Sequence, residues 1–172
     1  SKGITLQPFK IGPDYLDSQQ LSAVSGRPCR NLDLLLSGSE WVKTSFSGFG
    51  GTAELALVEG VMGLFDGLGS SEKGSTASVA CQLNLPVILV VDGSRQAGSI
   101  AALVKGFRDH DPNLHFAGVV LNRVNSLRHK KLLIEALAGI GIRVFGCLPK
   151  DPQLTLPSSH LGLIPLRRNI DF

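Results

Sequence analysis

The feature that most constrains this fold is a series of short apolar runs separated by segments with helical spacing. The runs are mostly continuous rather than alternating, which is typical of strands covered on both faces. They lie at Ile4–Phe9, Leu55–Val58, Val87–Val91, Phe116–Leu121 and Ile142–Phe145. Helices are expected at Leu16–Val24, Glu40–Phe46, Thr76–Leu85, Ala97–Asp109 and Leu127–Ala138. This alternation predicts an α/β fold with a mostly parallel sheet and right-handed crossovers.

Capping residues support two of the helices. Ser75 and Ser126 precede the third and fifth helical segments and are good N-caps, and Gly139 follows the fifth. A length of 172 residues predicts a single domain over 1–172. The stretch 149–172 is rich in proline, and we expect a tail or the approach to a further domain there.

Charge and cysteine usage exclude several classes of protein. The net charge is only +3, and the basic groups at 128–131 and 167–168 are too small to indicate a nucleic-acid partner. Three widely spaced cysteines form no CxxC pair, which argues against a disulfide framework or a zinc site and favours reduced thiols in the cytoplasm. No apolar stretch approaches the roughly 20 residues that cross a bilayer, so no membrane partner is expected.

Polar and charged side chains follow four of the predicted strands. The carboxyl ends of parallel strands meet at one edge of a sheet, where ligands bind in open α/β folds. We therefore expect these residues to share a site: Lys10, Asp14 and Asp17 after the first strand, Glu59 and Asp66 after the second, Asp92 after the third, and Asn122 and Arg123 after the fourth.

These residue types suit phosphoryl chemistry. The carboxylates of Asp14, Asp17, Glu59 and Asp66 are candidate Mg²⁺ ligands, because Mg²⁺ prefers a few carboxylates plus water and phosphate oxygens. Lys10 would neutralise the charge that develops on a transferred phosphoryl group. The Asn122 amide offers a donor and an acceptor to an adenine edge.

A phosphate-binding loop is not visible in this sequence. The motif G-x-x-x-x-G-K-[ST] does not occur, and in the segment 69–76 the lysine precedes Gly74 instead of following it. We interpret that segment as a surface turn and a helix cap. The expectation is that an N-terminal strand-loop-helix unit lies upstream of Ser1, and that this chain alone is inactive.

Several strings resemble one family, the cobyrinic acid a,c-diamide synthases. They are Phe9–Asp17, Gly26–Pro28 with Asn31–Asp33, Glu59–Gly67, Gly74–Ala77, Leu121–Val124 and His160–Leu163, in matching order and spacing over nearly the whole chain. The resemblance implies a three-layer P-loop NTPase-like sheet, similar to dethiobiotin synthetase, with helices on both faces. It also implies amidation of the a and c acetate side chains of a corrinoid, with ATP and Mg²⁺, through an acyl phosphate. Ammonia would come from a C-terminal glutaminase domain, and a homodimer is possible.

The resemblance also implies roles for individual residues. Lys10, Asp17 and Asp66 would be catalytic, and Asp14, Tyr15 and Leu16 would bind the substrate. Asn122 and Arg123 would bind the nucleotide, and Asp14 and Glu59 would hold Mg²⁺.

This sequence departs from the family pattern in three places. The phosphate loop and the glutaminase domain are absent, and Ser159 stands where the family commonly carries an arginine. Three alternatives remain open: an amidotransferase acting on another corrinoid or tetrapyrrole acid, a ParA- or MinD-like ATPase switch, and a scaffold without nucleotide. The string Pro13-Asp14-Tyr15 argues against cobyric acid synthase.

Overall fold

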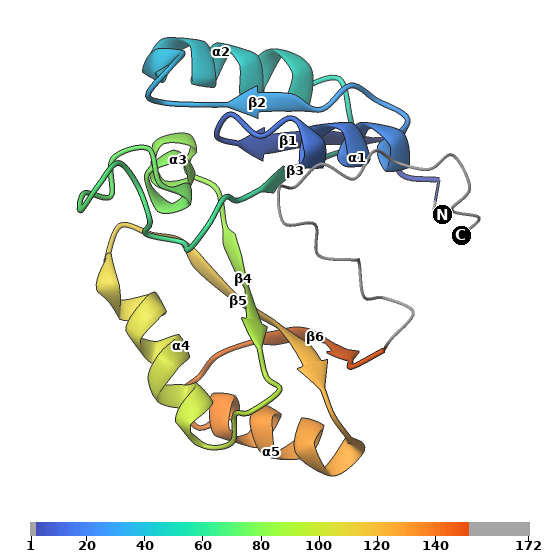
Figure 1. Cartoon of the computed structure of the whole chain (residues 1–172), viewed down its shortest axis with the longest axis vertical. Helices are drawn as coiled ribbons and strands as arrows, with labels where there is room; N and C mark the ends of the chain where they lie inside the picture. Colours follow the sequence, from blue (N-terminus) through green and yellow to red (C-terminus); the bar gives the residue numbers. More distant parts are fainter. Residues whose placement is uncertain (1–2, 152–172) are drawn as a thin grey trace. The chain divides into compact units, whose positions relative to one another are not determined.

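A computed structural model describes residues 3–151, which divide into two compact units around the junction between Leu83 and Asn84. Each unit contains its own sheet of parallel strands with helices packed on it (Figure 1). The predicted α/β class is therefore confirmed. The predicted single-domain organisation over 1–172 stays a prediction.

The first unit carries a three-stranded sheet in the order β2-β1-β3. Its elements are β1 (Leu6–Ile11), α1 (Leu16–Ser25), β2 (Arg30–Leu32), α2 (Gly38–Gly50), β3 (Leu55–Glu59) and α3 (Thr76–Leu83). Both β2 and β3 pair with β1 in parallel, so all three strands end at the same edge.

Helices cover both faces of this first sheet. Phe9 and Ile11 of β1 pack in one core with Val42 of α2 and Val79 of α3. Successive strand residues point to opposite faces, so Lys10 lies on the other face, where its ammonium contacts Asp17 of α1. Burying a side chain the size of Phe9 stabilises the fold by about 1.5–3 kcal/mol.

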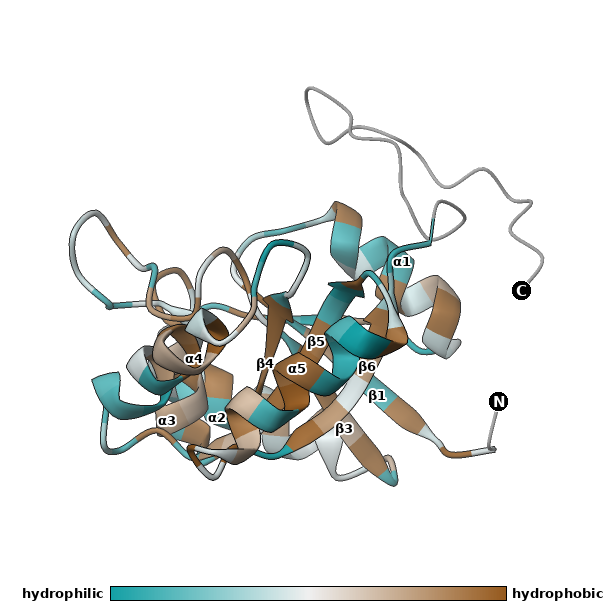
Figure 2. Cartoon of the chain, turned by 90° about the horizontal axis from the view of Figure 1, so that it is seen from below, coloured by the Kyte–Doolittle hydropathy of each residue, from teal (hydrophilic) through white to brown (hydrophobic). Residues whose placement is uncertain are grey.

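The second unit repeats the arrangement with strand order β4-β5-β6. Its elements are β4 (Val87–Asp92), α4 (Ser99–His110), β5 (Phe116–Val124), α5 (Leu127–Ala138) and β6 (Val144–Pro149). Both helices pack on one face, around a core of Val91, Ile100, Val104, Val119, Leu121, Leu133 and Leu137. The opposite face of β4 carries Ile88 and Val90, with Val90 63% exposed. Figure 2 shows β4 mostly in brown, the colour of hydrophobic residues.

The strand β5 contains a backbone position that requires glycine. Gly118 has a φ of +150°, and a Cβ there would lie 2.3 Å from the carbonyl oxygen of Arg143. The register of β5 shifts against both neighbours around this point. A side chain would therefore strain the backbone and also separate β5 from the segment that leads into β6.

All five predicted helices are present, and α5 has the predicted bounds, with Ser126 Oγ accepting from the His129 N–H. The sequence missed β2, which has only three residues. The first and last strands begin two residues later than expected, at Leu6 and Val144. In the second unit, Ile142 packs into the core before β6 starts. The predicted continuous burial is wrong for β3 and β4, whose residues alternate in exposure.

Two further expectations concern the C-terminal stretch and the absence of a membrane-spanning segment. The expected tail is described only to Asp151; its remainder and the string His160–Leu163 lie outside the described residues. Within residues 3–151, no helix has the length and apolar character needed to cross a bilayer.

Candidate functional site

Three polar side chains form a row across the sheet of the first unit. Lys10 of β1 is in register with Asn31 of β2 on one side and with Glu59 of β3 on the other. Partners in register on adjacent parallel strands present their side chains to the same face. The row therefore lies at the carboxyl end of the sheet, on the face that α1 covers.

Lys10 is the centre of a buried charge cluster. Its side chain is only 3% exposed, and its ammonium lies 3.2 Å from Asp17 Oδ2 and 3.5 Å from Glu59 Oε1. It also donates to the carbonyl oxygen of Gly60 at 2.6 Å. A buried cation is tolerated only when it is paired and hydrogen-bonded, and these contacts provide a partner for each of the three ammonium hydrogens. Asp17 and Glu59 remain 40% and 44% exposed.

Asp14 shapes the loop that leads from β1 into α1. Its Oδ1 accepts from the backbone N–H groups of Leu16 at 3.0 Å and Asp17 at 3.1 Å. These donors belong to the first turn of the helix and have no partner within it. The turn at Gly12 needs a φ of +80°, which glycine adopts without strain. Tyr15 is 78% exposed, so its ring is available to a ligand.

Asp66 organises the loop that follows β3. Its Oδ2 accepts from the Gly63 N–H at 2.8 Å, so the carboxylate closes a short turn in its own loop. The start of that loop is fixed by Thr76 of α3, whose Oγ1 accepts from the Val61 N–H at 3.0 Å. A Cβ on Gly60 would lie 2.9 Å from the Thr76 side chain, so the close approach requires glycine.

Cys29 lies near this cluster but is not activated. Burial is the main cause that raises the pKa of its thiol, and the negative charge of Glu59 raises it further. The thiolate is the nucleophilic form of cysteine, so a raised pKa disfavours catalysis by this residue.

In the second unit, Asn122 and Arg123 lie near the end of β5. Asn122 Oδ1 accepts from the Arg123 N–H at 2.9 Å, and Arg123 has a left-handed φ of +55°. The Arg123 guanidinium pairs with Asp92 of β4 at 3.0 Å. The pKa of Asp92 is lowered mainly by the backbone N–H of Ser94, with a smaller contribution from Arg123.

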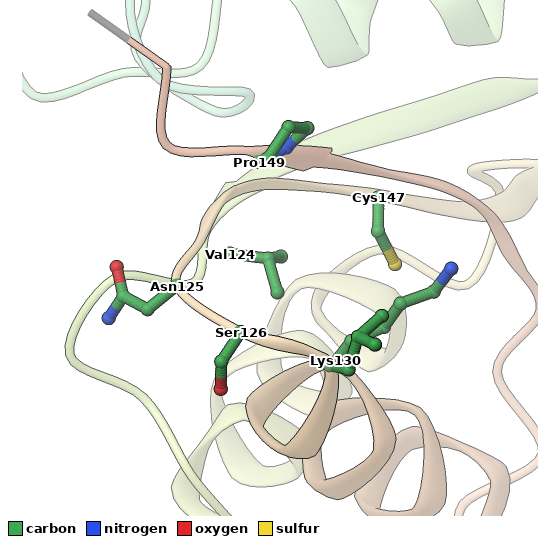
Figure 3. Close-up of a pocket in the computed structure, with 7 residues that line it drawn as sticks. Val124, Asn125, Ser126, Lys130, Cys147 and Pro149 are labelled. Carbon is green, nitrogen blue, oxygen red and sulfur yellow. The ribbon is translucent and has the colours of Figure 1, made fainter.

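The second unit also holds a shallow pocket of about 350 Å³ where β5, α5 and β6 meet (Figure 3). Val124, Asn125, Ser126, Leu127, Lys130, Cys147 and Pro149 line it. Figure 3 shows Val124 and Cys147 pointing toward the helix and Asn125 pointing away from it. The sequence analysis identified Ser126 as a helix cap and did not predict this pocket. The nearest residues that it predicted to bind a ligand are Asn122 and Arg123.

The acidic residues suit a metal ion that waters and substrate phosphates help to hold, rather than a site built from protein ligands alone. Within residues 3–151, no group of three or more His, Cys, Asp or Glu side chains could hold a metal ion. Mg²⁺ commonly takes one or two carboxylates and completes its shell with waters and substrate phosphates. Glu59 keeps an exposed carboxylate at the end of β3, and the Asp14 carboxylate lies on the loop after β1.

The structure thus brings together some of the predicted site residues within the first unit. Lys10, Asp17 and Glu59 are in direct contact, and Asp14 joins them through the first turn of α1. Asp66 bonds within its own loop, and Asn122 and Arg123 belong to the second unit. Asn31, which the sequence named only within the string Asn31–Asp33, was not predicted as a site residue.

Comparison with known proteins gives one family for the chain. The family model for the CobQ/CobB/MinD/ParA nucleotide binding domain matches residues 1–164. The cobyrinate a,c-diamide synthase of Gloeobacter violaceus is 45% identical over 98% of this chain and 38% of its own length. That of a Synechococcus strain is 48% identical over 94% of the chain and 36% of its own length. The hydrogenobyrinate a,c-diamide synthase of Streptomyces coelicolor is 46% identical over 96% of the chain and 34% of its own length. The chain therefore spans little more than a third of these relatives.

Proposed function

The chain belongs to the CobQ/CobB/MinD/ParA nucleotide-binding domain family, and we propose that the protein that carries it amidates the a and c acetate side chains of cobyrinic acid. In this proposal ATP activates each carboxylate and ammonia from glutamine completes the amide. The observation that carries the proposal is the cluster in which buried Lys10 contacts Asp17 and Glu59 at the carboxyl end of a parallel sheet.

The proposed reaction has two bond exchanges for each carboxylate. A carboxylate oxygen of the substrate attacks the γ-phosphorus of ATP, the bond to the β,γ-bridging oxygen breaks, and ADP leaves. Ammonia then attacks the acyl carbon of the acyl phosphate, inorganic phosphate leaves with the former carboxylate oxygen, and a proton is released. Catalysis of the first exchange needs mainly positioning and positive charge near the phosphoryl oxygens.

Lys10 supplies that positive charge in this proposal. Its contact with Glu59 is the longest of its three, at 3.5 Å, so it is the one most readily exchanged for a phosphoryl oxygen. Asp17 and Gly60 would keep the ammonium in place during this exchange. Asp14 and Glu59 would hold Mg²⁺, which when bound neutralises phosphate charge and orients the phosphate chain.

The loops after β1 and β3 would receive the acid substrate. Tyr15, Leu16 and Asp17 follow Asp14, which fixes the start of α1. Asp66, held against Gly63, would contact the substrate or its intermediate from the second loop. In the second unit, Asn122 and Arg123 would bind the nucleotide. The residues that line the pocket begin with Val124, directly after Arg123 in the sequence.

Two further parts of the proposal concern the rest of the protein. Ammonia would be released by hydrolysis of glutamine on a separate glutaminase domain. A homodimer and a cytoplasmic location remain predictions.

A second candidate substrate is the related acid hydrogenobyrinate. One relative, 46% identical, is named for hydrogenobyrinate instead of cobyrinate. An ATPase switch of the MinD or ParA type shares the family description. A switch would hydrolyse ATP without any carboxylic acid substrate, so dependence of ATP turnover on the acid distinguishes the two classes.

An isotope transfer experiment tests the proposed activation step. The complete protein would be incubated with Mg-ATP, glutamine and cobyrinic acid carrying ¹⁸O in its carboxylates. We expect one ¹⁸O in the inorganic phosphate for each amide formed. Amide formation without label in the phosphate would contradict the acyl phosphate, and phosphate release without the acid would favour a switch.

A further inference from the structure

Asn31 is the third member of the row that contains Lys10 and Glu59, and its amide nitrogen bonds to the loop that leads from β1 into α1. Its Nδ2 donates to the carbonyl oxygens of Gly12 at 2.7 Å and Asp14 at 3.0 Å. We propose that Asn31 is a positioning residue that holds the Gly12–Asp17 loop in the geometry needed to bind the acid substrate. This inference rests on the proposed function and deepens it.

The loop needs a tether from outside its own backbone. Regular pairing of β1 with β2 ends at Ile11 and Leu32. Beyond that point, the Gly12 N–H donates to Leu32 at 3.2 Å, and Pro13 has no N–H to donate. In the described part of the chain, the carbonyl groups of Gly12 and Asp14 accept hydrogen bonds from side chains.

Asn31 supplies both of its amide hydrogens to this loop. A primary amide carries two donors on one nitrogen, and here each points at a different carbonyl. Ser18 of α1 reinforces the same place, because its Oγ donates to the Asp14 carbonyl at 2.7 Å. The Asp14 carbonyl thus accepts from a strand and from a helix, which fixes the loop between them.

The register explains why this tether matters for the site. Asn31 is paired with Lys10 across the sheet, so its side chain links the loop to the part of the sheet from which the buried Lys10 ammonium projects. Asp14 in turn accepts from the N–H groups of Leu16 and Asp17. Asn31 therefore acts through Asp14 on the proposed substrate-binding residues, and a displacement of about 1 Å in such a site can cost about 100-fold in rate.

Substitution by aspartate tests the tether with little change in shape. In Asn31→Asp an oxygen replaces the amide nitrogen, so an acceptor faces two carbonyl acceptors. We expect the KM for the corrinoid acid to rise about tenfold or more, and the KM for Mg-ATP to rise by clearly less, because the tether also holds the loop of Asp14, a proposed Mg²⁺ ligand. Asn31→Ser, which is too short to reach but adds no charge, should shift the acid KM in the same direction by less.

The control is Asn113→Ala, which changes an asparagine in a loop of the second unit and should leave both KM values unchanged. A general structural defect would instead lower kcat and weaken binding of acid and ATP together. Unchanged acid KM in both Asn31 variants, or equal effects on acid and ATP, would overturn the proposal.

Amide hydrogen exchange keeps this test separate from that of the function. In the protein without ligands, the N–H groups of Leu16 and Asp17 should exchange about tenfold faster in Asn31→Asp than in the wild type. The later turns of α1 should be unaffected. If the wild-type protein amidates no corrinoid, the proposed function fails while accelerated exchange still supports the tether. Unchanged exchange at both positions would overturn it.

Discussion

At the scale of single residues, the charge on Lys10 is the feature on which the proposed chemistry depends. The ammonium is buried, while its partners Asp17 and Glu59 keep much of their surface in solvent. The carboxylates can therefore hydrate without the lysine, whereas the lysine depends on the carboxylates. Removing the lysine should affect function more than folding.

Lys10→Met tests this directly, because methionine keeps much of the length and apolar surface of the side chain and loses the charge. We expect amidation by the complete protein to fall at least about 100-fold, since a preorganised charge at the phosphoryl group is removed. The matched control is Lys43→Met, an exposed lysine paired with Glu40. Turnover of the Lys10 variant near that of the control would remove Lys10 from the chemistry.

The role of the Asp66 charge can be tested without breaking the hydrogen bond that closes its loop. In Asp66→Asn the side-chain oxygen still accepts from the Gly63 N–H, so the substitution isolates the negative charge. We expect corrinoid amidation to fall about tenfold or more while ATP affinity is retained. An unchanged amidation rate would show that the charge of Asp66 has no part in the reaction.

The lowered pKa of Asp92 predicts a pH dependence for the stability of the second unit. Hydrogen bonding from Ser94 and pairing with Arg123 hold the pKa of Asp92 below its ordinary 3.8. A lowered folded pKa contributes stability above the unfolded value that is lost as the pH falls through the folded pKa. The melting temperature of Asp92→Asn should therefore lie below that of the wild type at pH 7, and the difference should shrink below about pH 4. A constant difference across that range would contradict the assignment.

At the scale of the elements, local sequence signals were sufficient to predict the helices. They were insufficient to predict the strand β2 and the tether formed by Asn31. Ser126 and the apolar spacing of 127–138 define α5, because a cap and a periodic face act within one segment. The strand β2 has three residues, and its place is fixed by pairing with residues 21 positions earlier, as in the pair Lys10 and Asn31. Asn31 was missed for the same reason, since its partners become neighbours only once that register forms.

The cap of α5 gives an element-scale prediction. Ser126→Ala removes the acceptor of the His129 N–H and should destabilise the protein by about 1 kcal/mol. Leu127→Ala in the same first turn is the control, because that side chain is 86% exposed and its loss should change stability by less than about 0.5 kcal/mol. Chemical denaturation compares the two, and equal stabilities would show that the cap contributes nothing.

At the scale of the whole molecule, strand-end reasoning predicted one site for the polar residues of four strands, and within the first unit the structure brings Lys10, Asp17 and Glu59 of that set into contact. These contacts form because residues at the ends of parallel neighbours meet wherever the strand order allows. The loop contacts of Asp14 and Asp66 could not be predicted, because they depend on turn geometry after the strands end. Family membership adds nucleotide binding, and the corrinoid substrate remains the central proposal.

The most direct test of that proposal is the mass of the product. The complete protein would be incubated with cobyrinic acid, Mg-ATP and glutamine, beside Glu59→Gln as a matched variant that loses the proposed metal-binding charge. We predict a monoamide and then a diamide in the wild type, with ATP consumed in proportion, and at least about 100-fold less product in the variant. ATP hydrolysis without any amidated corrinoid, or a variant as active as the wild type, would contradict the account.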